Sequence, residues 1–183
     1  MNWVATTILL AVAFLAVYGE TSFNELRRVI GVQVDLLPSL MVYAGLSYGL
    51  GVVVVLAVCG GLWFDALSAN PLGVSVLPLF LAGFVIQHYR GLILRDQIFA
   101  QWVLGLGASA MVPALTVLLL INLNTRPLVG WFSLWQWFVM TLVGGAVTPL
   151  WFALFDGIHG ALVYRPIGDT SFRPDREIKR GRQ

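Results

Sequence analysis

The stretch GGLWFDALSANPLGVSVLPLF, residues 60–80, joins two apolar runs through a short polar segment. Asp65 lies near the end of the first run, and Pro71 and Gly73 follow in the connection. Asparagine before proline initiates turns, and proline is favoured at the first position of a helix. The stretch therefore predicts two antiparallel helices joined by a short connection.

Asp65 occupies an unfavourable place for a carboxylate in this arrangement. The dipole of a helix disfavours a negative charge at its C-terminus, so the side chain requires donors from elsewhere. The nearest donors are the free backbone N–H groups at the start of the following helix. We expect Asp65 to cap that helix across the connection. Simple solvation and contact with a partner protein are the alternatives.

The composition indicates a membrane protein. Of the 183 residues, 58% are hydrophobic and only 11% are charged, whereas about a quarter of the residues in a soluble domain are charged. The apolar residues form long runs and do not alternate as in a transmembrane barrel. We expect an all-α polytopic membrane domain over residues 1–164, followed by a basic cytoplasmic tail over 165–183. The first run lacks a basic flank and is interpreted as a membrane helix rather than a signal peptide.

Six apolar segments are expected along the chain. They cover residues 2–18, 36–46, 48–67, 72–90, 99–123 and 139–164, the last after a tryptophan-rich approach, WFSLWQWF, that suits the headgroup region. The second segment has 11 residues and a length of about 16 Å, against about 30 Å of hydrocarbon. It is either a separate short helix or the first part of one long helix over 36–67, so the bundle has six or five crossings. Gly45, Gly49 and Gly51 favour the break.

The distribution of lysine and arginine predicts the orientation. With six crossings, eight cations lie on the side of the tail: Arg90, Arg95, Arg165, Arg173, Arg176, Lys179, Arg180 and Arg182. Three lie opposite, Arg27, Arg28 and Arg126, and five crossings would change the balance to ten against one. Because cytoplasmic loops are enriched in these residues, the tail and the N-terminus are expected in the cytoplasm. The tail cations would lie near anionic lipids or a partner.

Two groups of polar residues within the apolar segments are candidates for a site. Asp156 and His159 are three residues apart and share a helix face, which suits a structural hydrogen bond or a functional pair. Ser109 and His159 superficially resemble an intramembrane protease dyad, but their expected depths differ. No zinc, nucleotide or dinucleotide motif occurs in the sequence. We therefore expect no catalytic, cofactor or metal site, and no nucleic-acid partner.

Three stretches together resemble the rod shape-determining protein MreD family: VDLLPSLMVYAGLSYGLG (34–51), the stretch 60–80, and HYRGLILRD (88–96). The resemblance covers about residues 34–164, and its strongest element is the spacing of Asp65, Pro71 and Gly73. The tryptophan-rich approach and the long basic tail depart from the family pattern.

The resemblance implies a non-enzymatic scaffold in the bacterial cytoplasmic membrane. It implies pairing with MreC, through its membrane helix and on the periplasmic side, and coupling of MreB filaments to peptidoglycan synthesis by RodA and its class B transpeptidase. Asp65, Pro71 and Gly73 would shape an external hairpin beside MreC. The expected arrangement is also similar to the S-components of energy-coupling-factor transporters, so a vitamin-binding S-component is the alternative function.

Overall fold

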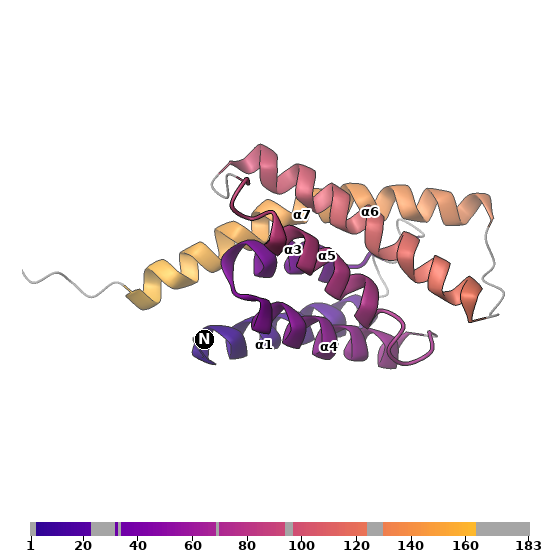
Figure 1. Cartoon of the computed structure of the whole chain (residues 1–183), viewed down its shortest axis with the longest axis horizontal. Coiled ribbons are helices and arrows are strands. Elements are labelled where there is room, and N and C mark those ends of the chain that lie inside the picture. Colours follow the sequence, from indigo (N-terminus) through magenta and orange to yellow (C-terminus); the bar gives the residue numbers. More distant parts are fainter. Residues whose placement is uncertain are drawn as a thin grey trace, which may run out of the picture.

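The computed structural model describes residues 3–22, 32, 34–68, 70–93, 97–123 and 130–163, the last five without side chains. These ranges hold six helices and no strand: α1 (Trp3–Ser22), α3 (Leu37–Ser47), α4 (Leu50–Leu67), α5 (Val76–His88), α6 (Ile98–Asn122) and α7 (Trp131–Val163). Figure 1 shows them packed side by side along one long axis. The expected all-α fold is confirmed.

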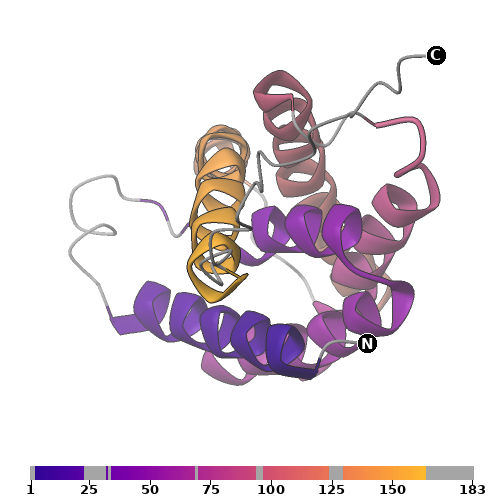
Figure 2. The same cartoon turned by 90° about the vertical axis from the view of Figure 1, so that its left-hand side faces the viewer.

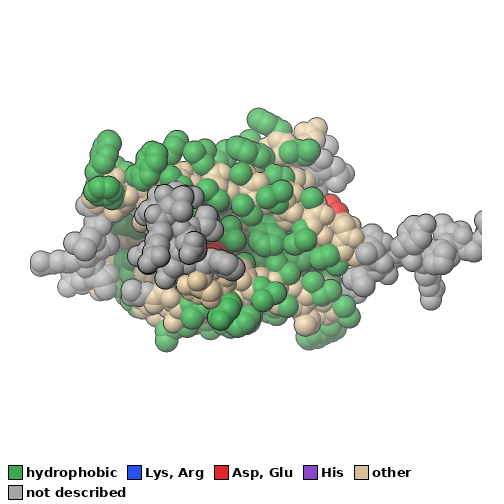
Figure 3. All heavy atoms as spheres, turned by 180° about the vertical axis from the view of Figure 1, so that it is seen from behind, with side chains coloured by type: hydrophobic (Ala, Val, Ile, Leu, Met, Phe, Trp, Pro, Cys, Tyr) green, Lys and Arg blue, Asp and Glu red, His purple; other side chains and the backbone are tan. Residues whose placement is uncertain are grey.

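Four of these helices, α1, α4, α6 and α7, are long and apolar enough to cross a membrane. The helices α3 and α5 have 11 and 13 residues, about 16 Å and 20 Å, and are too short to cross about 30 Å of hydrocarbon alone. Hydrophobic side chains are spread over much of the described surface in the view of Figure 3. Exposed aliphatic side chains such as Val54, Val58 and Leu62 of α4 suit contact with lipid tails.

The chain breaks between α3 and α4, as its glycines predicted. Tyr48 and Gly49 adopt extended backbone conformations, and α3 then lies antiparallel against α4. A β-carbon added to Gly60, late in α4, would lie 3.2 Å from Leu37 Cδ2 at the start of α3. The alternative of one long helix over residues 36–67 is therefore wrong.

Helix α3 lies at the centre of the bundle (Figure 2). It contacts every other described helix, and its residues from Leu37 to Leu46 are all buried. The ring of Tyr43 stacks on Phe155 of α7 at 4.5 Å between centroids, and Phe152 packs edge-on against it at 5.0 Å. Because this short helix is enclosed by longer ones, its position fixes the spacing of the whole bundle.

Helices α6 and α7 pack closely through small residues. The positions that face each other are Gly105 with Thr148 and Ser109 with Gly144. A β-carbon added to Gly144 would overlap the Ser109 side chain, so the two backbones approach as closely as these residues allow. Helix α7 is continuous from residue 131, whereas the sequence predicted a separate approach before a crossing that starts at residue 139.

Candidate functional site at the Asp65 end of the bundle

Asp65 lies in the last turn of α4 and is 2% exposed. Its Oδ2 accepts hydrogen bonds from the backbone N–H groups of Gly73 at 2.8 Å and of Ser75 at 3.0 Å. Its Oδ1 accepts one from the Ser75 hydroxyl at 2.5 Å. Asp65 thus reaches across the connection as predicted, but it binds the turn that leads into α5 and not the first N–H groups of the helix itself, which begins at Val76. Its two oxygens are engaged within the chain, so simple solvation is excluded.

Pro71 and Gly73 form the turn that brings these donors to Asp65. The Val74 N–H donates to the Pro71 carbonyl at 3.3 Å, and Gly73 has a φ of 89°. This left-handed conformation is costly for residues with a β-carbon, which explains glycine at this position. Pro71 is exposed on the outer side of the connection, whereas the N–H groups of Gly73 and Ser75 point inward to Asp65.

Two further carboxylates, neither of them predicted from the sequence, lie at the same end of the bundle. Glu20, at the end of α1, accepts a hydrogen bond at Oε1 from the Leu36 N–H at 2.6 Å. Asp35 accepts one at Oδ1 from the Leu37 N–H at 2.9 Å. Each carboxylate binds an otherwise free N–H at the start of α3. Asp35 was recognisable, because an aspartate shortly before Pro38 is typical of a helix start.

Burial is the main influence on the acidity of Asp35, which is 6% exposed. Removal from water raises the pKa of Asp35 to about 7; the hydrogen bond from Leu37 opposes this effect and the charge of Asp65 adds to it. No group of three or more described His, Cys, Asp or Glu residues could hold a metal ion. The geometry of these carboxylates therefore supports a structural role at the ends of α1, α3 and α4.

The opposite end of the bundle holds Arg90, which is exposed. Its Nη1 donates to the Tyr48 carbonyl, in the turn between α3 and α4, at 3.4 Å. The predicted cations Arg95, Arg173, Arg176, Lys179 and Arg180 lie outside the described residues. Among the residues that are described, Arg90 and Asp65 thus mark opposite ends of α4.

The polar residues of α7 do not form the predicted inward face. Thr148 and Phe152 are buried as expected, but Asp156 is exposed, because Phe155 takes the inward position in that turn. The side chain of His159 is outside the described part of the structure. Ser109 faces Gly144, which precedes residue 159 by 15 residues, or about 22 Å of continuous helix. Ser109 and His159 are therefore not brought together as a dyad.

Comparison of the chain with known protein families, with curated proteins and with solved structures found no match.

Proposed function

We propose that this protein is a non-enzymatic scaffold of the bacterial cell-wall elongation machinery. In this role it pairs with MreC and helps couple MreB filaments to peptidoglycan synthesis by RodA and its class B transpeptidase. The observation that carries the proposal is the Asp65 cap. The residues that carry the resemblance to the MreD family, Asp65 and Gly73, are bonded directly to each other.

The chemistry of the cap favours a structural role over catalysis. A catalytic carboxylate must reach a substrate, whereas Asp65 is buried and both of its oxygens accept hydrogen bonds from the chain itself. The cap holds the connection between α4 and α5 in one conformation. A fixed connection with outward side chains, such as Leu72 at 71% exposure, suits the recognition of another protein.

The other end of the bundle suits the cytoplasmic side. Arg90 lies there, and the basic tail follows α7, which ends at the same side. Cations near an anionic inner leaflet contribute about 1 kcal/mol each to membrane association. In the proposed function this side faces the inner leaflet and the filament, while the Asp65 end faces the periplasm.

Co-purification with MreC from detergent-solubilised membranes tests the proposal. Gly73→Val places a β-branched residue at a positive φ and should disrupt the connection. Gly91→Val is the matched control, because a β-carbon at Gly91 meets no atom within 4 Å. We expect MreC with the wild type and with Gly91→Val, and much less with Gly73→Val at equal expression.

Two results would contradict the proposal: absence of MreC from the wild-type sample, or equal recovery with all three proteins. A rise in melting temperature upon addition of a vitamin, without MreC recovery, would instead support the S-component alternative.

A further inference from the structure

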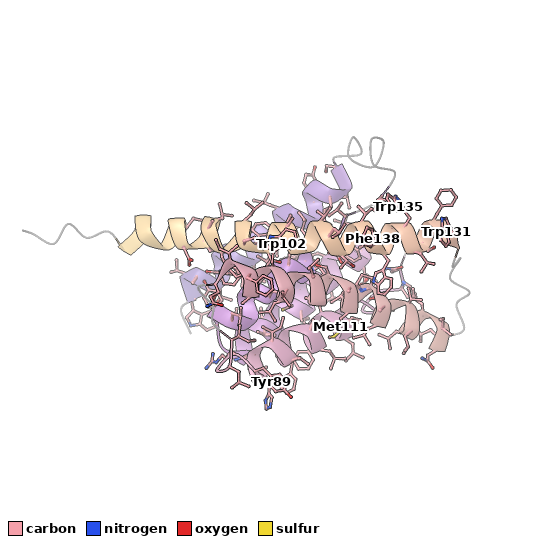
Figure 4. All side chains as sticks on the ribbon, turned by 90° about the horizontal axis from the view of Figure 1, so that it is seen from above. Tyr89, Trp102, Met111, Trp131, Trp135 and Phe138 are labelled. Atoms are coloured by element: carbon pink, nitrogen blue, oxygen red, sulfur yellow. The ribbon has the colours of Figure 1, made fainter. Side chains whose placement is uncertain are left out.

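The hairpin of α6 and α7 has an inner part that packs in the bundle and an outer part that extends beyond the other helices (Figure 1). Among the described residues, Val112 is the last buried one of α6 and Gly144 is the first buried one of α7. We call residues 114–122 and 131–143 the outer hairpin. Figure 4 shows Trp131, Trp135 and Phe138 along its α7 segment. The rest of the bundle therefore encloses none of the described side chains of the outer hairpin.

Pro113 weakens α6 at the boundary of the outer hairpin. Proline lacks an N–H group, so the Ser109 carbonyl has no donor at the usual position four residues further along the helix. The proline ring also crowds this carbonyl, and helices bend most often at such positions. The turn from Ser109 to Pro113 is therefore the turn at which α6 bends most easily.

Helix α7 has its own weak position at the same level. The Ser109 side chain lies directly against Gly144, and Gly145 follows. Glycine disfavours the helical conformation more than any other residue except proline. Two consecutive glycines therefore make this turn of α7 easier to bend than the turns around it. Both helices can thus bend at one level, about the close contact between Ser109 and Gly144.

The hydroxyl group of Ser109 is unsatisfied in the observed conformation. Ser109 is 1% exposed, and its Oγ has no hydrogen-bond partner among the described residues. By contrast, the described threonines of α6 and α7 each donate to the carbonyl four residues earlier: Thr116, Thr141 and Thr148. The same bond from Ser109 would reach the Gly105 carbonyl, and bonds of this type often bend helices. A bent α6 would therefore satisfy a hydroxyl that is costly to leave unpaired when buried.

Trp137 couples the outer part of α7 to the weakened turn of α6. Its Nε1 donates to the Ala110 carbonyl at 2.9 Å. Ala110 lies between Ser109 and Pro113, so this bond joins the two helices at the turn where α6 bends most easily. The two helices of the outer hairpin are therefore expected to move together and not to separate.

We propose that the outer hairpin swings as one unit relative to the bundle, about a hinge formed by the turn 109–113 of α6 and the pair Gly144–Gly145 of α7. In one state the Ser109 hydroxyl lies against Gly144, as observed. In the other state it donates to the Gly105 carbonyl, and α6 is bent at Pro113. The first state has the closer contact between the helices and the second has the satisfied hydroxyl, so we expect both to be populated. The inference does not depend on the proposed function.

Distances between pairs of spin labels test the hinge in detergent and in lipid nanodiscs. The labels are attached in a Cys59→Ala background at exposed positions. One pair joins Leu62→Cys of α4 to Leu134→Cys of the outer hairpin. The control pair joins Leu62→Cys to Leu154→Cys on the inner part of α7. We expect two populated distances for the first pair and a single distance for the control pair.

Three substitutions connect the two distances to the hinge residues. Pro113→Ala restores the missing N–H donor and should leave a single distance for the first pair. Ser109→Ala removes the hydroxyl and should reduce the population of the second distance at least threefold. Gly107→Ala is the matched control on the same helix, because its added β-carbon meets nothing within 4 Å, and it should change neither distance. A single distance for the first pair in the wild type would overturn the hinge, as would two distances that either Pro113→Ala or Ser109→Ala leaves unchanged.

Discussion

At the scale of single residues, the ends of the helices are held by carboxylates that bind backbone N–H groups. Asp65 binds the turn before α5, while Glu20 and Asp35 bind the first N–H groups of α3. The N–H groups of Leu36 and Leu37 have no partner within α3, and those of Gly73 and Ser75 belong to the turn before α5. In an apolar bundle such donors are expensive to leave unpaired, so these few polar residues determine where the helices begin.

Asp65→Ala should lower the stability of the bundle. The substitution leaves the Gly73 and Ser75 N–H groups and the Ser75 hydroxyl without their acceptor. Each buried donor left without an acceptor costs about 1–3 kcal/mol, so with three such donors we expect a loss of at least about 3 kcal/mol. Asp65→Asn should lose less, because its amide oxygen still accepts. Thermal unfolding in detergent measures the effect, and an unchanged midpoint for Asp65→Ala would refute the cap.

The contribution of Asp35 to stability should fall as the pH rises from about 4 to about 7. The pKa of Asp35 is raised by burial to about 7 in the folded protein, against about 4 in an unfolded chain. The folded state therefore binds more protons within this window, and each rise in pH favours unfolding. The melting temperature should be higher at pH 5 than at pH 8. Asp35→Asn should reduce this difference in melting temperature between pH 5 and pH 8. If the variant shows the same difference as the wild type, groups other than Asp35 cause it.

At the scale of helices, the sequence predicted positions well where turn chemistry marks the boundary. The break between α3 and α4 lies at Gly49, and the connection between α4 and α5 contains Pro71. The continuity of α7 was not predictable, because its tryptophan-rich start has the composition of a headgroup-level segment and carries no helix signal that links it to the crossing. Nothing in the local sequence shows that this start continues into the following helix. The continuity is supported by the packing of α7 along α6.

Because α6 and α7 pack closely, substitution of two of their glycines by alanine should affect stability differently. Gly144→Ala places a β-carbon against Ser109 and should destabilise the protein by about 1–3 kcal/mol, the usual cost of overpacking. Gly107→Ala, whose β-carbon meets nothing within 4 Å, should be neutral or slightly stabilising. Thermal unfolding of both variants in the same detergent provides the comparison. Equal midpoints would contradict the close approach at Gly144.

At the scale of the whole molecule, composition was sufficient to predict an all-helical fold, and four of the described helices are long and apolar enough to cross a membrane, as a membrane protein requires. The Asp65 cap was also predictable, because the dipole of α4 requires donors and the turn chemistry places them nearby. The central position of α3 was not, since its apolar sequence would suit a lipid-facing helix equally well. Likewise Asp156 was expected to share a buried face but is exposed, because helix rotation depends on tertiary packing around Phe155.

The central claim is that the Asp65 connection and Arg90 lie on opposite sides of the cytoplasmic membrane. Cysteine labelling with a membrane-impermeant reagent tests it most directly. In a Cys59→Ala background, Asn70→Cys reports on the connection and Gly91→Cys on the Arg90 side. We predict that Asn70→Cys is labelled when only the periplasmic face is accessible, and that Gly91→Cys is labelled only after the membrane is permeabilised. Labelling of both positions from the same side would contradict the account.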